Sequence, residues 1–213
     1  MNIREKGSKL PKALEEIYPV AECSLYATND YELLFATRLS AQCTDARVNI
    51  VTPKLFETFD TLEKFANAEV SDVAELIKTC GLYKGKARDL VNAAKMLVND
   101  FDGKVPNNMD DLLKLPGIGR KTANLILGDI YGAPSIIADT HCIRLSNRIG
   151  FVKDTKDPLK VEMALRKHIP QKYQTKFCHR LVHFGREFCT AQSPKCEICP
   201  ITEFCNHYKK TFK

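Results

Sequence analysis

The amino-acid sequence predicts an all-α protein. Apolar residues recur three and four positions apart along most of the chain, which is the pattern of helices with one buried face. The strict alternation of apolar and polar residues that marks a strand is nearly absent. Glycine or proline closes most of the periodic runs, as expected where a helix ends. With 213 residues, 44% of them hydrophobic, the chain can bury a core in one large domain or in two lobes.

The first half of the chain predicts a series of helices, each with its own signals. Residues 31–41 (YELLFATRLSA) are apolar on nearly all sides, which predicts a buried central helix. Asp60 with Glu63 has the pattern of a capping box for a short helix, and Ser71 is the expected cap of the next one. The helices expected here are 8–18, 31–41, one from 45 through 55, 60–68, 71–80, 87–98 and 108–115.

A glycine hairpin, LPGIG (115–119), comes before an apolar helix that starts near Arg120. Gly117 and Gly119 let backbone N–H groups approach a flat or anionic ligand, because no Cβ stands in the way. The start of the helix adds unpaired N–H donors and a partial positive charge. The segment is therefore predicted to bind a phosphate. Further helices are expected at 140–149, 158–169 and 172–188.

The net charge of +6 is distributed unevenly along the chain. Lys and Arg outnumber Asp and Glu by 15 to 7 in residues 134–213, whereas residues 22–133 contain 13 basic and 16 acidic side chains. The change in charge coincides with the Gly132-Ala133-Pro134 punctuation, which we take as the boundary between two lobes. A basic half beside a nearly neutral one indicates a polyanionic partner on one side of the molecule.

Nine cysteines divide into two groups. Five lie among apolar residues and are expected to be small buried side chains: Cys23, Cys43, Cys80, Cys142 and Cys178. The other four have the spacing C-x6-C-x2-C-x5-C: Cys189, Cys196, Cys199 and Cys205. Four thiolates can enclose a tetrahedral zinc ion or a [4Fe–4S] cluster. Because zinc sites more often contain two short cysteine pairs, and only one is present, the spacing slightly favours the cluster.

These motifs together resemble those of the endonuclease III family, iron–sulfur members of the helix-hairpin-helix superfamily of DNA glycosylases. LPGIGRKTA (115–123) is followed by IADTHCIRLSNRIG (137–150) and by the four-cysteine loop, in the family's order. The resemblance extends upstream to LSAQCTDARVN (39–49) and GLYKGKA (81–87), and so covers nearly the whole chain. It implies a six-helix lobe over 22–133, with the helix-hairpin-helix at about 108–131, and a [4Fe–4S] lobe made of 134–213 with 1–21. DNA is expected between the two lobes.

The resemblance also implies roles for individual residues. Lys121 matches the lysine whose amine attacks C1′ of the damaged nucleotide, and Asp139 matches the catalytic aspartate. From its sequence context, Asp139 is also a candidate N-cap of the helix that follows it. Gln42 and Leu82 match the residues that fill the gap left by a flipped nucleotide, with a helix-end polar residue and a core leucine as the alternatives. The four clustered cysteines match the [4Fe–4S] ligands. Further DNA contacts are expected at Gly117, Gly119, Arg120, His141, Arg144 and Arg186, although helix packing explains His141 and Arg144 equally well.

The predicted activity is that of a bifunctional enzyme for base-excision repair. It would release oxidised or damaged pyrimidines from double-stranded DNA and cleave the strand 3′ to the abasic site by β-elimination, through a Lys121 Schiff base. We expect an intracellular, cytoplasmic monomer associated with the nucleoid and not with a membrane, because the sequence has no long apolar run. The loop between Cys189 and Cys196 (TAQSPK) has one charge, Lys195, and is less basic than usual for the family. Arg186, Lys209 and Lys210 are candidates to compensate.

Two other functions fit part of the pattern. Adenine-mismatch glycosylases share the fold, but they generally lack the lysine of the hairpin helix and carry a further C-terminal domain. Lys121 and the end of this sequence eight residues after Cys205 argue against that assignment. A non-catalytic DNA-binding protein would need only the hairpin and a zinc site. The colour of the protein and covalent trapping on abasic DNA would separate these possibilities.

Overall fold

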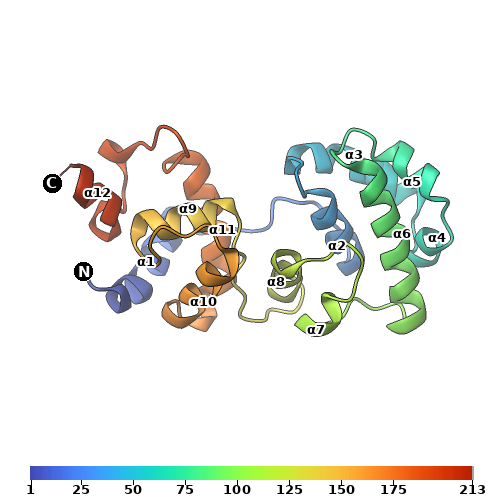
Figure 1. Ribbon diagram of the computed structural model, residues 1–213, viewed down its shortest axis with the longest axis horizontal. Helices are drawn as coiled ribbons and strands as arrows, with labels where there is room; N and C mark the ends of the chain where they lie inside the picture. The colour runs from blue at the N-terminus through green and yellow to red at the C-terminus, as the bar shows by residue number, and fades with distance from the viewer. Residues whose placement is uncertain (213) are drawn as a thin grey trace. The chain divides into compact units, whose positions relative to one another are not determined.

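The computed structural model describes residues 1–212, which are all-α as predicted: they form twelve α-helices and three short 3₁₀ helices, and no strand (Figure 1). The helices are α1 (Ile3–Ile17), α2 (Asp30–Leu39), α3 (Asp45–Thr58), α4 (Leu62–Ala66), α5 (Val70–Leu76), α6 (Tyr83–Asp100), α7 (Met109–Leu112), α8 (Arg120–Asp129), α9 (Thr140–Ile149), α10 (Pro158–His168), α11 (Gln174–Glu187) and α12 (Asn206–Thr211), with 3₁₀ helices η1 (Gln171–Tyr173), η2 (Cys196–Ile198) and η3 (Thr202–Phe204).

The chain divides into two compact units. The middle unit is Cys23–Tyr131, and the terminal unit consists of Met1–Glu22 together with the residues from Gly132 onward. Both ends of the chain therefore belong to the same unit. Each unit is described separately below.

The middle unit is organised around α2, which packs against α3, α6 and α8. Leu34, Phe35 and Leu39 are at most 1% exposed, which agrees with the nearly uniform apolar character of this segment. The ring of Phe35 meets that of Phe65 edge-on, 5.0 Å between centroids, and so joins α2 to α4. All of Cys23–Tyr131 is described, and it contains seven helices, α2–α8. The seven helices match the seven segments expected from the residue patterns, one more than the six-helix lobe that the family resemblance implied, and two of them, α4 and α7, have only five and four residues.

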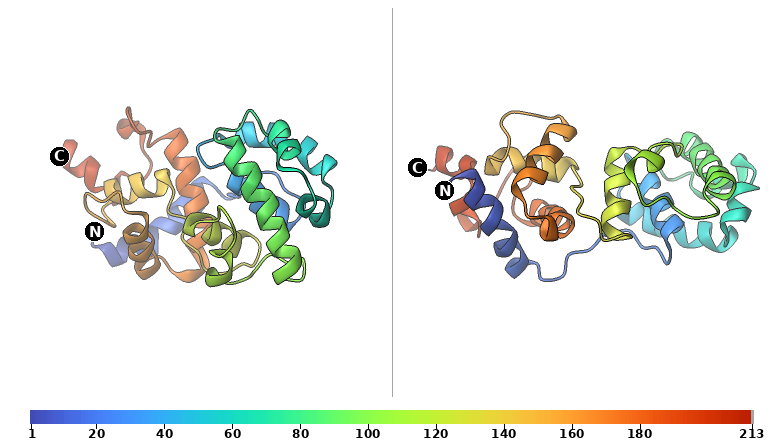
Figure 2. Two further views of the ribbon diagram at one scale, coloured as in Figure 1. Left: turned by 45° about the vertical axis from the view of Figure 1, so that its right-hand side comes forward. Right: turned by 90° about the horizontal axis from the view of Figure 1, so that it is seen from below.

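In the terminal unit, helices from opposite ends of the sequence pack side by side. The N-terminal helix α1 contacts α10 and α11, and α9 contacts α10, α11 and α12 (Figure 2). Leu10 and Leu14 of α1 are fully buried with Leu145, Leu165 and Leu181 of the C-terminal helices. At 25 cal/mol per Å² of buried apolar area, each such side chain contributes about 2 kcal/mol. This shared core holds α1 to the helices of residues 132–212.

Several helix ends differ from those predicted. Helix α1 begins at Ile3 rather than near residue 8, because Asn2 and Glu5 form a capping box. The cap of α4 is Thr61 and not Asp60, which instead pairs with Lys64 at 2.8 Å. Ser71 lies inside α5, whose N-cap is Glu69. Helix α12 was not predicted, because its six residues are too few to show a helical period.

Burial confirms three of the five scattered cysteines as core residues. Cys80 and Cys142 are 0% exposed and Cys178 is 2% exposed. Cys23 and Cys43 are only partly buried. No helix within residues 1–212 combines the length and apolarity required to cross a membrane.

Candidate functional site

The hairpin of the middle unit joins α7 to α8, and its two glycines have different surroundings. Gly117 has φ +74°, a left-handed conformation that favours glycine, and a Cβ there would lie 2.3 Å from Nε of Arg38. A Cβ at Gly119 would meet nothing within 4 Å. The protein's own packing therefore requires a glycine at 117 but not at 119. An external group approaching the backbone at Gly119 would benefit from the missing Cβ.

Helix α8 begins directly after Gly119, which is its N-cap and supplies no side-chain hydrogen bond. The first N–H groups of a helix have no partner within it, and the helix dipole makes this end partially positive. An anion can therefore bind at this end of α8. The helix holds its position because its apolar residues, including Ala123 and Ile126, are 0% exposed. It packs against α2 and α7.

Lys121 is the second residue of α8, and its side chain is exposed. Its ammonium lies close enough to Cys23 to lower the pKa of that thiol, although burial has the larger effect and raises it to about 11. The structure thus places Lys121 at the positive end of a fixed helix, where its amine can reach a ligand bound at the helix start.

Asp139 lies in the terminal unit and is the N-cap of α9, as its sequence context suggested. Its Oδ1 accepts a hydrogen bond from the backbone N–H of Cys142 at 2.7 Å. This bond fixes the carboxylate at the first turn of α9, and Oδ2 takes no part in it. Asp139 is half-buried, next to the buried segment formed by residues 135–138.

Gln42 and Leu82 occupy two neighbouring turns of the middle unit with the same unusual backbone. Their φ angles are 54° and 58°, in the left-handed region that non-glycine residues seldom adopt. A Cβ at Gly81 would lie 3.1 Å from the carbonyl oxygen of Gln42, so the two turns are adjacent. Leu82 is 66% exposed, which rules out the core-leucine alternative. Such strain, of order 1–3 kcal/mol per residue, concentrates at ligand-binding sites.

A buried lysine lies behind these two turns. Lys86 of α6 is 0% exposed, and its Nζ donates to the carbonyl oxygen of Leu39, at the end of α2, at 2.8 Å. Burial lowers the pKa of Lys86, and the thiols of Cys43 and Cys80 oppose this effect. Those two thiols are hydrogen-bonded to each other, and burial, together with Cys43, raises the pKa of Cys80 to about 11. The elements that carry Gln42 and Leu82 are therefore joined by a charged hydrogen bond.

The remaining predicted DNA contacts have varied surroundings. Arg144 donates to the carbonyl oxygens of Gly185, at 3.0 Å, and Cys189, at 3.1 Å, and its NH2 lies 3.1 Å from Nδ1 of His141. These contacts favour the packing alternative for both side chains. Arg120 and Arg186 are exposed. A DNA contact by any of the four stays a prediction.

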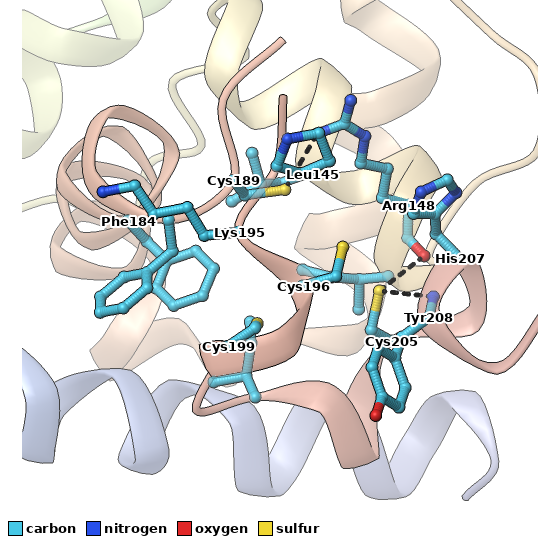
Figure 3. A pocket seen from close by; sticks show the side chains of 14 residues that line it. Leu145, Arg148, Phe184, Cys189, Lys195, Cys196, Cys199, Cys205, His207 and Tyr208 are labelled. Carbon is cyan, nitrogen blue, oxygen red and sulfur yellow. Dashed lines mark hydrogen bonds between the residues drawn. The ribbon is translucent and has the colours of Figure 1, made fainter. Parts of the chain in front are cut away.

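The four clustered cysteines surround one pocket of the terminal unit (Figure 3). Cys189 follows α11, Cys196 and Cys199 belong to η2 and its end, and Cys205 precedes α12. The wall between them is largely apolar, with Leu145, Ile149, Phe184, Phe188 and Ile201 among the lining residues. In the part of the chain that is described, no three His, Cys, Asp or Glu side chains are grouped tightly enough to hold a single metal ion.

Hydrogen-bond donors reach two of these sulfur atoms. Arg148 NH1 donates to Sγ of Cys189 at 3.2 Å, and the backbone N–H of Tyr208 donates to Sγ of Cys205 at 3.4 Å. Burial raises the pKa of the Cys199 thiol, and so do the neighbouring cysteines. Holding four thiolates together therefore requires a positively charged group in the pocket. Four soft sulfur ligands in an apolar wall, with N–H donors on the sulfurs, fit an iron–sulfur cluster.

Sequence reasoning missed several residues that position this machinery. Arg148 donates to the carbonyl oxygens of Thr190, at 2.7 Å, and Ala191, at 2.8 Å, and so fixes the cysteine loop as well as touching Cys189. Lys86 and the Arg38–Asp89 ion pair, 2.6 Å between NH2 and Oδ2, were not singled out either. Lysine and arginine side chains are normally solvated, so the sequence gives little reason to expect these contacts. For Arg38 one sign was present: it is a charged residue in an otherwise apolar helix.

Comparison with known proteins agrees with this geometry. The family model described as "HhH-GPD superfamily base excision DNA repair protein" matches residues 35–171. A second model, "Iron-sulfur binding domain of endonuclease III", matches residues 189–205, which hold the four cysteines. The chain belongs to the HhH-GPD superfamily of base excision DNA repair proteins, and its cysteine loop is an iron–sulfur binding domain.

Similar proteins show to which family within this superfamily the chain belongs. The endonuclease III of Bacillus subtilis (strain 168) is 41% identical over 213 residues, which is 100% of this chain and 97% of that protein. The endonuclease III of Haemophilus influenzae is 37% identical over 97% of this chain and 98% of that protein. A solved structure of a trapped endonuclease III–DNA covalent intermediate is 39% identical, covers 100% of both chains and superimposes with a TM-score of 0.93. The protein is a member of the endonuclease III family, base-excision repair enzymes that combine DNA glycosylase and AP lyase activity.

Proposed function

We propose that this enzyme releases oxidised pyrimidines from double-stranded DNA and then cleaves the strand through a covalent intermediate on Lys121. The observation that carries the proposal is the position of Lys121 at the uncapped N-terminus of α8, directly after the open Gly119. A phosphate bound at this helix start brings a nucleotide within reach of the amine. The covalent DNA complex solved for a similar endonuclease III supports a nucleophilic mechanism.

The reaction we propose has two bond-breaking stages. Nζ of Lys121, as the neutral amine, forms a bond to C1′ while the bond from C1′ to the base breaks, and the base leaves with a proton. One proton of the attached nitrogen then moves to O4′ as the C1′–O4′ bond breaks, and the opened sugar is a protonated Schiff base (C1′=NζH⁺), which acidifies the C2′ proton. Transfer of that proton to a proton acceptor forms the C1′–C2′ enamine, which then expels the phosphate from C3′. Strand cleavage 3′ to the lesion follows by β-elimination.

Asp139 is proposed to stabilise the positive charge that develops on the sugar as the base leaves. The hydrogen bond from Cys142 N–H to Oδ1 fixes the carboxylate, and Oδ2 remains to face a ligand. A carboxylate held by its backbone needs little reorganisation during the reaction, which makes its electrostatic effect larger than that of a mobile side chain.

Recognition of the damaged base requires the nucleotide to leave the duplex, and other side chains then fill the gap. We propose that Gln42 hydrogen-bonds the unpaired partner base and that Leu82 inserts between stacked bases. Both side chains stand on strained, adjacent turns, and Leu82 is exposed although it is strongly apolar. Gly117, Gly119, Arg120 and Arg186 are the proposed contacts to the phosphate backbone.

The cluster in the cysteine loop is proposed to be [4Fe–4S], held by Cys189, Cys196, Cys199 and Cys205. When bound, it supplies the positive iron centre that four adjacent thiolates require. Its four ligands lie between the end of α11 and the start of α12, so a bound cluster would hold this loop in place. The chain's own contribution is the apolar wall and the N–H donors of Arg148 and Tyr208.

Covalent trapping tests the lyase mechanism. Borohydride reduces a Schiff base, so the enzyme should form a stable adduct with abasic duplex DNA, and the adduct should be absent in Lys121→Ala. Folded wild-type protein that yields no adduct would sink the Schiff-base proposal. A duplex with an oxidised thymine, compared with an adenine–guanine mismatch, tests the base preference. Release of adenine in place of the oxidised thymine would favour the adenine-mismatch alternative.

A further inference from the structure

One ion pair of the middle unit lies where three parts of the proposed DNA-binding surface converge. Arg38 of α2 donates to Oδ2 of Asp89 on α6, from Nε at 2.9 Å and from NH2 at 2.6 Å. The two side chains are 19% and 25% exposed, so the pair is partly shielded from water. Two donors of one guanidinium on a single oxygen restrict its plane and its distance from the carboxylate.

The glycine hairpin rests on this pair. A Cβ on Gly117 would lie 2.3 Å from Nε and 2.8 Å from Cδ of Arg38, and 2.5 Å from Oδ2 of Asp89. The backbone of Gly117 therefore lies directly against both partners. Its left-handed φ of +74° turns the chain at this point. The place of the hairpin relative to α2 and α6 is therefore constrained by this backbone contact with the ion pair, in addition to the apolar packing of α8 on α2.

The same two helices carry the turns that hold Gln42 and Leu82. Helix α2 ends at Leu39, three residues before Gln42, and α6 begins at Tyr83, immediately after Leu82. A rigid connection between these helices and the hairpin keeps the phosphate-binding backbone at a fixed distance from the two gap-filling side chains. DNA binding requires that distance to match the spacing between a phosphate and the base stack it belongs to.

Stability alone does not account for the pair. A partly exposed ion pair contributes only about 0–1 kcal/mol to folding, and a charged side chain at 38 interrupts an otherwise apolar stretch of α2. An apolar residue at position 38 would stabilise the fold as well as the ion pair does, or better. The pair instead provides a contact surface of fixed geometry for the backbone of the hairpin.

We propose that Arg38 and Asp89 are positioning residues for DNA binding: their ion pair sets the hairpin at Gly117 in register with the turns of Gln42 and Leu82. This rests on the proposed function, in which the hairpin binds phosphate and the two turns fill the gap. Neither side chain touches the substrate in this proposal. Losing either partner displaces the hairpin, so both losses weaken binding.

The test compares Arg38→Met and Asp89→Asn, using binding to a duplex with a stable abasic-site analogue at several salt concentrations. Each variant should bind about tenfold more weakly, and the slope of log K against log salt should fall in magnitude by about 1, because one phosphate contact contributes about 0.9. Affinities are measured well below the unfolding temperature, so that a loss of stability alone leaves them unchanged. The double variant should bind the duplex no more weakly than the weaker-binding single variant, because both substitutions remove the same interaction.

The sign of the Asp89→Asn effect separates positioning from simple charge. Removing a carboxylate near DNA strengthens binding if net charge alone matters, whereas positioning predicts weaker binding. Arg166→Met is the matched control, since Arg166 pairs with Glu162 at 3.0 Å in the terminal unit; its salt slope should equal that of the wild type. Tighter binding by Asp89→Asn, or unchanged affinity in both variants, overturns the inference.

A failure of the positioning role can be distinguished from a failure of the proposed function. Wild-type enzyme that forms the borohydride adduct, with unaltered affinity in both variants, refutes only the positioning role. Wild-type enzyme that forms no adduct refutes the Schiff-base mechanism, whatever the variants do. Should Arg38→Met fold poorly, Asp89→Asn gives the same answer, because it changes one atom type and no volume.

Discussion

The Nζ of Lys86 donates a hydrogen bond to the carbonyl oxygen of Leu39 at 2.8 Å, across 47 positions of the sequence and with no exposure to solvent. The bond satisfies a carbonyl at the C-terminus of α2, where a positive charge also complements the helix dipole. It joins α2 and α6, the helices next to which the turns of Gln42 and Leu82 stand in the sequence. Lys86 therefore supports those turns without reaching the surface.

Replacing Lys86 by methionine should lower the free energy of unfolding by about 2 kcal/mol, the value of a hydrogen bond to a charged group. It should also weaken binding to the abasic-analogue duplex, because the two turns lose their common support. Lys6 is a matched control: it is 2% exposed, and its Nζ caps the carbonyl of Ile149, at the end of α9, at 2.6 Å. Lys6→Met should cost comparable stability and less affinity. Equal losses of affinity would contradict the role of Lys86.

Asp139 should show separable structural and chemical roles. Asparagine caps helices as well as aspartate does, so Asp139→Asn should leave the free energy of unfolding within about 0.5 kcal/mol of wild type. Base release should nevertheless fall by about 10²–10³, the usual cost of one preorganised electrostatic contact. Asp139→Ala should lose the activity and, in addition, about 1 kcal/mol of stability.

Asp157, the cap of α10, is the control for this pair of variants. Its Oδ1 accepts from Leu159 N at 2.9 Å and from Lys160 N, three residues on as in the cap of α9, at 3.4 Å. Asp157→Ala should therefore cost about 1 kcal/mol while base release is unchanged. If Asp139→Asn kept full activity in a glycosylase assay, the charge of Asp139 would have no part in the chemistry.

The catalytic roles of Lys121 and Asp139 were expected from the resemblance to the endonuclease III family, and that resemblance could be seen because its motifs are local. A glycine hairpin before an apolar helix, and an Asp at the start of another helix, are recognisable within a few residues, and α9 and its cap were predicted correctly. The support for these features is not local: Arg38 and Asp89 are 51 positions apart, and Arg148 is 41 from Cys189. A single sequence does not reveal which of its 32 Lys and Arg residues are held by carbonyls or carboxylates of distant helices.

Leu82→Gly should make the protein more stable and less active. Leucine at φ 58° carries backbone strain that glycine does not, so the substitution should gain about 1 kcal/mol, less the extra entropy of glycine in the unfolded chain. Loss of the exposed apolar side chain should weaken binding to a duplex that contains the abasic analogue. Asp102, at φ 52°, provides the comparison. Asp102→Gly should relieve less strain, because aspartate tolerates this conformation better than leucine, and should leave DNA affinity as it is.

Arg148 should control the lifetime of the cluster. Its guanidinium touches Sγ of Cys189 at 3.2 Å and holds the carbonyl oxygens of Thr190 and Ala191. Arg148→Met should therefore release iron to a chelator at least about tenfold faster, followed as loss of visible absorbance, because each charged hydrogen bond is worth about 1.5–3 kcal/mol. Arg166→Met, away from the pocket lining, should lose iron at the wild-type rate. Identical rates in both variants would show that Arg148 does not stabilise the site.

Two histidines should make the terminal unit sensitive to mild acid. Burial, with help from Lys167 and Arg4, lowers the pKa of His168, and burial with Arg186 lowers that of His183. A lowered pKa in the folded state means that folding favours the neutral ring. The stability this provides is fully present above the unfolded pKa of about 6.5. It is lost progressively as the pH falls through the lower, folded-state values.

The free energy of unfolding should accordingly decrease below about pH 6.5, and the double variant His168→Gln/His183→Gln should show a shallower decrease. Denaturant unfolding from pH 7.5 to pH 5, followed by circular dichroism, measures both slopes. Acid also attacks iron–sulfur clusters, so visible absorbance is recorded at each pH and only samples with full absorbance are compared. Parallel slopes for the wild type and the double variant would mean that other groups, and not these two rings, govern the acid sensitivity.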